Sequence, residues 1–348
     1  MTRLIGLALT LLLYAMPAYS QALQEGVRGS YSGAVESVHP DWFKQSFLVF
    51  EEDVQEATAA GKRVLIYVYQ NGCPYCDALI NHNMAQRDIE TKLRQHFDVI
   101  ALNMWGDRSI ESVTGQSFTE KTFARAIGVT YTPTLLFLSE SGQVVLRLNG
   151  YVPPRQFRLA LDYVAGHKEQ EYSFQDYLAS VQPPPGSGEL RTERYFMTPP
   201  YRLAERVRET GPARPLLVLF EQQQCPDCEQ FHEHVLGAAE TRVLLEQFDV
   251  VQLDMWADTP LQTPSGEAST ARQWARSLAI AYAPSLVLFD HQGQEVIRAD
   301  AQFKRFHTQS ILDYVISGAY HNEPEFQRYL QARAERLLEQ GVNVDIWH

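Results

Sequence analysis

Long apolar runs recur along the chain and predict a series of buried strands. Residues Arg63–Tyr69 are almost all β-branched, aliphatic or aromatic, as a strand covered on both faces requires. Further strands are predicted at 98–104, 134–138 and 144–148. Mixed apolar and charged stretches predict helices at 41–60, from Cys73 to about 97, at 119–127 and at 151–165. This order of elements predicts an α/β domain that ends in a hairpin.

The same pattern occurs twice. Phe97-Asp98-Val99 matches Phe248-Asp249-Val250, and Tyr131-x-Pro133 matches Tyr282-x-Pro284, both at an offset of 151 residues. Strands of the second half are predicted at 215–220, 250–255, 285–289 and 295–297. Because the repeat is as long as a domain, it predicts two tandem α/β domains.

The ends of the two halves are marked by unusual composition. One positive charge, an apolar run from Leu4 to Ala15 and small residues before Gln21 predict a signal peptide at 1–20. The Pro-Pro-Pro-Gly-Ser-Gly run predicts a linker at 182–188. The predicted domains are therefore 21–181 and 189–348. We expect export to the periplasm and no membrane insertion of the mature chain, because the apolar run is shorter than a bilayer span.

The charge and the motifs exclude several classes of function. The formal net charge is −12, which argues against nucleic acid or an anionic membrane surface as a partner. The chain also lacks a phosphate-binding loop, a nucleophile elbow and a dinucleotide fingerprint.

Four cysteines are present, and all of them fall in two Cys-x-x-Cys pairs, Cys73/Cys76 and Cys225/Cys228. Each pair follows a predicted strand and opens a predicted helix. Cysteines three residues apart in a first helical turn lie on one face, close enough to form a disulfide. The positive end of the helix dipole favours a thiolate on the first cysteine. The pattern therefore predicts two redox-active dithiols.

A proline precedes the third strand of each half, in Thr132-Pro133 and Ala283-Pro284. Together with Cys-Pro-x-Cys on a strand-to-helix turn, this arrangement resembles the thioredoxin superfamily. The resemblance implies a mixed central sheet flanked by helices in each domain, a cis-proline facing each disulfide, and no cofactor. It also implies roles: Cys73 and Cys225 attack, Cys76 and Cys228 resolve, and Thr132, Pro133, Ala283 and Pro284 bind substrate.

Other motifs resemble the SoxW-like exported thioredoxins of bacterial sulfur-oxidation systems: Asp41-Trp-Phe-Lys-Gln-Ser-Phe47, Ala60-Gly-Lys-Arg63, Gly72-Cys-Pro-Tyr-Cys76 and Met104-Trp-Gly-Asp107. The resemblance implies a periplasmic thiol–disulfide oxidoreductase, or a dithiol electron relay, that serves sulfur oxidation or other periplasmic redox proteins. Its substrates would be protein or small thiols and disulfides. A reductive role would require a membrane-bound electron donor, and the sequence leaves the direction of transfer open.

The chain departs from the thioredoxin pattern near both pairs. Tyr67 and Leu219 stand where many thioredoxins carry a buried acid. Asp227 lies inside the second motif, and its negative charge disfavours a thiolate on Cys225. We therefore expect Cys73 to be the more reactive of the two attacking cysteines.

Alternatives from other classes remain open. The four cysteines could form one zinc site, or Cys225, Cys228 and His232 could lie on one helical face and bind a metal. The second domain could instead bind a partner without catalysis. We expect no metal, with His232 on a solvated helical surface. Trp105 and Trp256 could line the active-site groove, but we expect them to pack at the ends of strands.

Overall fold

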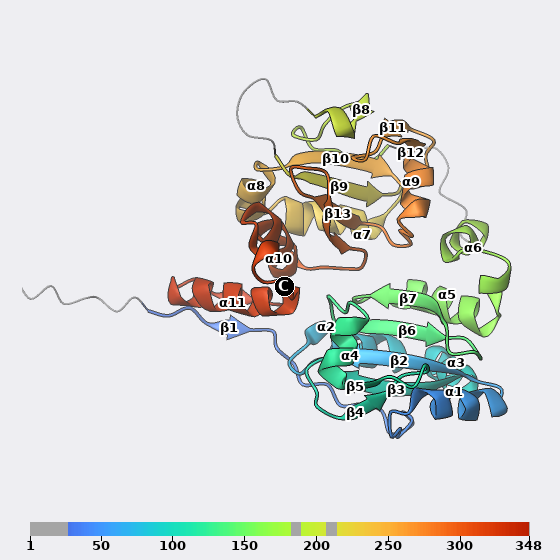
Figure 1. Ribbon diagram of the computed structural model, residues 1–348. Coiled ribbons are helices and arrows are strands. Elements are labelled where there is room, and N and C mark those ends of the chain that lie inside the picture. Colours follow the sequence, from blue (N-terminus) through green and yellow to red (C-terminus); the bar gives the residue numbers. More distant parts are fainter. Residues whose placement is uncertain (1–26, 182–188, 207–213, 348) are drawn as a thin grey trace, which may run out of the picture.

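The computed structural model describes residues 27–181, 189–206 and 214–347 (Figure 1). Within these ranges the chain forms two α/β units, each built on a four-stranded sheet. The predicted signal peptide at 1–20 and the predicted linker at 182–188 lie outside the described residues. In the ranges described, no helix combines the length and the apolar character that crossing a bilayer requires.

The first sheet has the strand order β3–β2–β6–β7. Its strands are β2 (Arg63–Tyr69), β3 (Phe97–Asn103), β6 (Thr134–Leu138) and β7 (Val144–Asn149). β2 and β3 run parallel, whereas β6 runs antiparallel to both β2 and β7. The four strands predicted from apolar runs are confirmed, each to within one residue.

Helices cover both faces of this sheet because successive residues of β2 point to opposite sides. Leu65 and Tyr67 pack in one apolar layer, and Val64 and Ile66 pack in the other. The first layer is closed by α2 (Pro74–Ala78), the π-helix η1 (Leu79–Met84), α3 (Arg87–His96) and α5 (Pro154–Ala165). The second layer is closed by α1 (Phe50–Ala59) and α4 (Glu120–Ala126).

Three sequence predictions for this unit need correction. The helix expected at 41–60 begins only at Phe50, because the Lys44 amide donates to the Val99 carbonyl at 2.8 Å and Leu48 has a left-handed φ of 63°. The helix expected from Cys73 to about 97 is broken into α2, η1 and α3. A short hairpin, β4 (Ser109–Glu111) and β5 (Ser117–Thr119), was missed because its strands are too short to show an apolar pattern.

The second unit repeats this layout with the strand order β10–β9–β13–β14. Its strands are β9 (Leu216–Glu221), β10 (Asp249–Asp254), β13 (Ser285–Phe289) and β14 (Glu295–Ala299). Its helices are α7 (Pro226–Phe231), the π-helix η4 (His232–Leu236), α8 (Ala239–Leu245), α9 (Ala271–Ser277), α10 (Arg305–Ile316) and α11 (Phe326–Glu339). A small separate sheet contains β8 (Tyr201–Arg202), β11 (Pro260–Gln262) and β12 (Ala268–Thr270).

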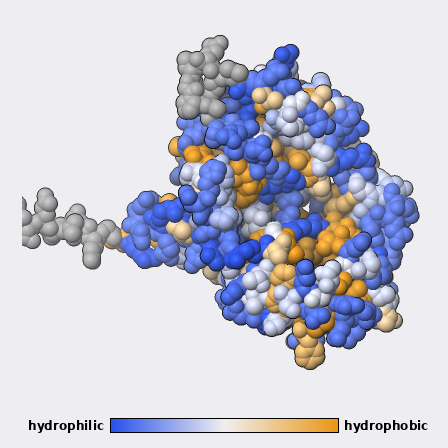
Figure 2. Space-filling view, viewed as in Figure 1, coloured by the Kyte–Doolittle hydropathy of each residue, from blue (hydrophilic) through white to orange (hydrophobic). Residues whose placement is uncertain are grey.

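The two units share one apolar core and meet through equivalent segments. A single cluster of buried side chains contains Phe157 of the first unit and Phe303 of the second. The chain after β7 meets the chain after β14, where the Gln302 amide donates to the Tyr151 carbonyl at 2.9 Å. Figure 2 shows hydrophobic residues gathered where the units face each other. The units are therefore packed together rather than strung on a linker alone.

The C-terminal helix of each unit reaches toward the other unit. α6 (Phe174–Val181) contributes Asp176, which forms an ion pair with Arg276 on α9. Beside α11, Glu325 pairs with Arg125 on α4. Arg125 and Arg276 occupy equivalent positions of the sequence repeat, whereas Glu325 and Asp176 do not.

The two ends of the described chain are also joined. β1 (Tyr31–Ser32) pairs in parallel with β15 (Val344–Asp345), and the Gly29 amide donates to the Leu338 carbonyl at 2.8 Å. Figure 1 shows α11 and β1 lying side by side, next to the end of the first unit that carries α2. A segment that precedes the first unit in sequence is therefore held by the end of the second.

Candidate active site

Each Cys-x-x-Cys pair lies at the start of a helix, where the first cysteine is the N-cap. The Cys76 amide donates to Sγ of Cys73 at 3.1 Å, and the Cys228 amide donates to Sγ of Cys225 at 3.0 Å. Pro74 and Pro226 occupy the first helical position, where a missing N–H leaves no hydrogen bond unmade. The local sequence thus fixes both turns.

Both pairs form disulfides, each with a Cα–Cα distance of 5.2 Å. Little of any cysteine is exposed: 4% of Cys73, 0% of Cys76, 7% of Cys225 and 5% of Cys228. In each pair the second cysteine is the more buried.

A cis-proline turn faces each disulfide. The Thr132–Pro133 and Ala283–Pro284 peptide bonds are both cis, as the resemblance implied. The Thr132 carbonyl oxygen lies 3.6 Å from Sγ of Cys73, and the Ala283 carbonyl oxygen lies 3.7 Å from Sγ of Cys225. In addition, the Thr132 hydroxyl donates to Sγ of Cys73 at 3.3 Å. Ala283 has no hydroxyl, so this hydrogen bond is absent from the second centre.

Two regions of the chain match a known protein family. The sequence profile of the thioredoxin-like domain family matches residues 50–165 and 204–316. The protein belongs to the thioredoxin-like family. Because each matched region carries one disulfide of the Cys-x-x-Cys type, it is a thiol–disulfide oxidoreductase of that family.

Several solved structures are similar to this thioredoxin-like chain. A thioredoxin-fold protein from Helicobacter pylori is 21% identical, with 40% of this chain and 92% of that one covered at a TM-score of 0.29. A thioredoxin from Thermus thermophilus is 24% identical, with 33% and 83% covered at 0.28. The oxidised C-terminal domain of DsbD from Neisseria meningitidis is 13% identical, with 35% and 93% covered at 0.24. A comparison with curated protein sequences finds no match.

The two thioredoxin-like centres differ in their surroundings. Cys73 lines a cavity of about 780 Å³ whose walls come from both units. A neighbouring cavity at Asp227 measures only about 50 Å³, and Cys225 does not line it. The first centre is therefore enclosed by distant parts of the chain.

Tyr75, the variable residue of the first motif, is anchored in the second unit. Its hydroxyl oxygen accepts the Lys304 amide at 2.9 Å and lies 3.3 Å from Nδ1 of His307. Its ring makes an edge contact with Trp347, with the ring centroids 5.3 Å apart. Burial raises the pKa of Tyr75 and lowers that of His307 to about 3, so both groups are neutral near pH 7. Tyr75 and His307 therefore form an uncharged, buried contact between the two units.

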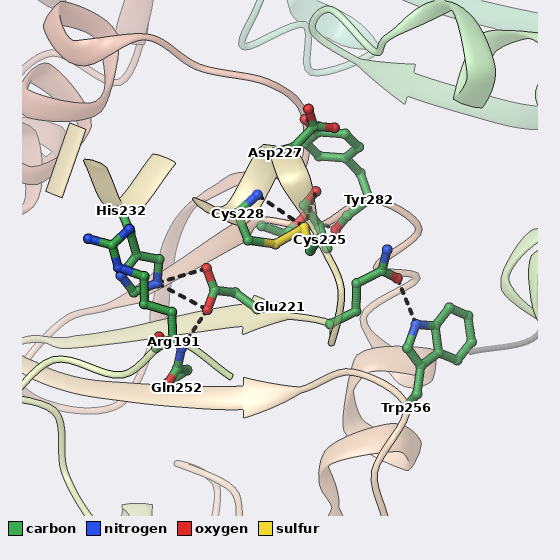
Figure 3. The surroundings of a disulfide bond; sticks show 12 residues. Arg191, Glu221, Cys225, Asp227, Cys228, His232, Gln252, Trp256 and Tyr282 are labelled. Atoms are coloured by element: carbon green, nitrogen blue, oxygen red, sulfur yellow. Dashed lines mark hydrogen bonds and ion pairs between the residues drawn. A yellow bond between two sulfur atoms is a disulfide. The ribbon is translucent and has the colours of Figure 1, made fainter. Parts of the chain in front are cut away.

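A carboxylate–imidazole pair lies beside the second disulfide (Figure 3). Nε2 of His232 lies 3.1 and 3.2 Å from the two carboxylate oxygens of Glu221, and its Nδ1 lies 3.2 Å from Glu193. The Gln252 amide also donates to Glu221. Only 1% of His232 is exposed, so the expectation that it lies on a solvated surface is wrong.

The charge of this pair is set by competing effects. Burial lowers the pKa of His232, but the hydrogen bonds and charges of Glu221 and Glu193 outweigh it and raise the pKa overall. A buried group of this kind can accept or release a proton near a reacting sulfur. The sequence already indicated Glu221 as a negative charge near Cys225, at the end of the apolar run 216–221, but sequence reasoning missed its pairing with His232.

In the first unit the residue equivalent to Glu221 is Tyr69, which lies beside Tyr67 and His39, and these three groups are uncharged. Tyr67 is fully buried, its hydroxyl has no hydrogen-bond partner among the described atoms, and burial raises its pKa far above the usual value. His39 packs against Tyr69 with ring centroids 4.4 Å apart, and burial lowers its pKa. The two centres therefore differ in the charge of the buried side chains beside the disulfide.

Asp227 lies where the sequence placed it, in the first turn after Cys225. It is half-buried, and its carboxylate accepts the Tyr282 hydroxyl at 3.4 Å. Burial raises its pKa, while the Tyr282 hydrogen bond and the charge of Lys304 lower it by less.

The two tryptophans have different environments. Trp256 packs against the core of the second unit, as expected, and donates to Oε1 of Gln222 at 2.9 Å. Trp105 is 37% exposed, donates to Oε1 of Gln70 at 2.9 Å and lines the cavity beside Cys73. The expectation that Trp105 only packs at a strand end is therefore wrong.

The cysteines and His232 are already engaged by other partners. Each sulfur is bonded within its own pair, and both nitrogens of His232 face carboxylates. In the part of the chain that the structure describes, no three His, Cys, Asp or Glu side chains are grouped to hold a metal.

Proposed function

We propose that this thioredoxin-like protein is an exported thiol–disulfide oxidoreductase or dithiol electron relay with two centres. The observation that carries the proposal is the juxtaposition, in each unit, of a helix-capping Cys-x-x-Cys disulfide and a cis-proline turn. Cys73 and Cys225 are the attacking residues, and Cys76 and Cys228 resolve the mixed disulfide.

This geometry is suited to the reductive half of an exchange cycle. The thiolate of a reduced pair attacks one sulfur of a substrate disulfide, forms a mixed disulfide and releases the other substrate sulfur as a thiolate. The second cysteine then attacks the first, releases the remaining substrate thiolate and closes the protein disulfide. Two electrons pass from the protein dithiol to the substrate. The amide of Cys76, 3.1 Å from Sγ of Cys73, stabilises the attacking thiolate.

The turns at Thr132-Pro133 and Ala283-Pro284 are proposed to hold the substrate backbone. Their support is the short distance between each turn carbonyl and the attacking sulfur, 3.6 Å at Cys73 and 3.7 Å at Cys225. Because proline has no N–H, the backbone beside it is left free to pair with an incoming extended segment.

The proposed location is the periplasm, in a role like that of the SoxW-like thioredoxins. The support is the signal-like pattern at 1–20 and the run Gly72-Cys-Pro-Tyr-Cys76. In the reductive direction, a membrane-bound dithiol donor would return the two electrons, since an oxidising compartment does not supply them.

Trapping tests this function. In Cys76→Ser and Cys228→Ser variants, the resolving thiol is gone and the attacking one remains, so mixed disulfides should accumulate on Cys73 and Cys225. Acid-quenched protein from the periplasm would be analysed by intact-mass and peptide mass spectrometry under non-reducing conditions.

The double variants Cys73→Ser/Cys76→Ser and Cys225→Ser/Cys228→Ser serve as matched controls at each centre. An adduct that dithiothreitol removes, absent from the matched control, supports exchange at that centre. The proposal fails if neither single variant carries an adduct of any mass.

A further inference from the structure

The cavity beside Cys73 is built from segments far apart in the sequence. Gly72, Cys73, Tyr75 and Thr132 form the side that holds the disulfide. The opposite walls come from α11, from the chain around β1, and from the start of α10 with Ile346. The first centre therefore faces a pocket and not an open surface.

In the part of the chain that the structure describes, the walls of this cavity have no counterpart at the second centre. α6 and α11 begin with the same Phe-Gln-x-Tyr-Leu motif, but α6 has 8 residues and α11 has 14. Ala334, Glu335 and Leu338, which line the cavity, lie on the part of α11 that extends beyond the equivalent of α6. The sequence repeat gives two similar centres. Among the described residues, the longer helix α11 covers the Cys73 centre, and the shorter α6 forms no such cover over the Cys225 centre.

The cavity walls opposite the Cys73–Cys76 disulfide are held in place by direct side-chain contacts. Arg28 forms an ion pair with Glu335, and the Gln70 amide donates to Oε1 of Gln327 at 3.0 Å. The guanidinium of Arg328 lies 5.7 Å from the centre of the Trp105 ring. The pocket is therefore formed before any substrate binds.

The lining favours an uncharged, peptide-like ligand. Five carboxamide side chains line the cavity: Gln70, Asn71, Asn103, Gln327 and Gln331. Phe303, Phe306 and Leu330 add apolar surface, and the charges of Arg28 and Glu335 already neutralise each other. Carboxamides both donate and accept hydrogen bonds, as peptide groups do. A volume of about 780 Å³ lies within the range of pockets for small ligands.

We propose that the Cys73 centre takes a short, uncharged cysteine-containing peptide as its disulfide substrate, bound in this cavity, in preference to a disulfide on a folded protein. The inference rests on the proposed exchange activity. The reduced Cys73 thiolate attacks the cysteine sulfur of the peptide disulfide and releases the other sulfur as a thiolate. Cys76 then displaces the peptide as its thiol and closes the Cys73–Cys76 disulfide, and an added dithiol restores the reduced state.

The test compares two substrates at two centres. The probe is an acetylated, amidated tetrapeptide without charged side chains, whose single cysteine carries 2-thiopyridine as a mixed disulfide. The same mixed disulfide on one surface cysteine of a folded carrier protein is the second substrate. Full-length Cys225→Ser/Cys228→Ser and Cys73→Ser/Cys76→Ser variants, pre-reduced, isolate the first and second centres, and stopped-flow absorbance gives the second-order rate constant for each.

We expect the ratio of peptide rate to carrier rate to be at least about tenfold higher at the first centre than at the second, because the walls hinder the carrier's approach to Cys73. Gln331→Trp should fill the cavity and lower the peptide rate at the first centre about tenfold. Ala332→Trp, an exposed change on the same helix outside the cavity lining, is the matched control. The rate at the second centre should be unchanged in both variants, which also checks folding.

Equal ratios at the two centres, or no effect of Gln331→Trp on the peptide rate, would overturn the pocket inference and leave the exchange activity standing. If reduced Cys73 reacts with neither substrate while its thiols are intact, the proposed exchange activity fails at this centre together with the inference.

Discussion

The imidazole of His232 is the main partner of the buried carboxylate of Glu221, and replacing it with leucine tests this pair. In the His232→Leu variant the side-chain volume is nearly kept, but Glu221 loses two contacts of 3.1 and 3.2 Å. Among the described residues, only the Gln252 amide then remains as a side-chain donor to Glu221. Both side chains are at most 2% exposed, so water does not replace the lost partner.

The expected loss of stability is about 3–5 kcal/mol, the usual cost of leaving one member of a buried ion pair alone. The Glu221→Leu/His232→Leu variant removes both charges and should recover most of that loss, since a well-packed apolar pair can replace a buried ion pair at little cost. The double variant is therefore the matched control.

The assay must resolve the two units, because a two-unit chain need not unfold in one step. Amide hydrogen exchange read by mass spectrometry would follow peptides from β9 and α7, with β2 and α2 as an internal reference. We expect protection to fall in β9 and α7 of His232→Leu and to return in the double variant. A double variant as unstable as the sum of the two single variants would refute the argument.

The same pair predicts how stability depends on pH. The pKa of His232 is raised in the folded state, so protonation favours folding. The contribution is complete below the ordinary pKa of about 6.5 and is lost as the pH rises through the raised folded value. Between about pH 6 and pH 9, β9 and α7 should lose protection more steeply in the native protein than in the double variant, after correction for intrinsic exchange rates. Equal slopes would show that the pair does not titrate in this range.

Three further outcomes are expected. The mature N-terminus should lie at Gln21 or within a few residues of it, and an intact mass of the periplasmic protein that retains Met1 would contradict export. Cys225 should react with iodoacetamide at a higher apparent pKa than Cys73, because Asp227 lies beside it and Ala283 lacks the hydroxyl that Thr132 donates to Sγ of Cys73 at 3.3 Å. The two pKa values would be measured in the full-length double-serine variants. An equal or lower pKa for Cys225 would contradict this order. Tyr75→Ala should destabilise the contact between the units by about 3–5 kcal/mol, as for other buried aromatic truncations, and Tyr75→Phe should destabilise it by about 1 kcal/mol. Limited proteolysis would follow both variants. Equal effects of the two substitutions would contradict the packing argument.

Much of the fold could be predicted because its signals are local. A run of apolar and aromatic residues such as 64–69 is typical of a strand buried on both faces, and the structure places it at the centre of its sheet. The positions of the two cysteine pairs at helix starts could be predicted as well, because helix capping by Cys73 and Cys225 depends only on the residues of one turn. The duplication followed from direct matches such as Tyr131-x-Pro133 and Tyr282-x-Pro284.

Other features depended on neighbours that no local pattern reveals. The periodicity at 41–60 is helical, yet the segment before Phe50 is held against β3 by the bond from Lys44 to Val99. His232 was expected on a solvated helical surface, but it is buried, and Glu221 and Glu193 lie opposite its two ring nitrogens.

The sequence by itself determined two thioredoxin-like units, their dithiols and the prolines that face them, because each depends on residues close together in the chain. The tertiary structure alone decided that the Cys73 centre faces a pocket whose walls come from both units. Tyr75 meets Lys304 across 229 positions of sequence, and Gln70 meets Gln327 across 257. Contacts at such separations arise only when the apolar faces of both units are buried together. Because hydrophobic burial is non-directional, the apolar pattern of each element does not record which other face it will meet.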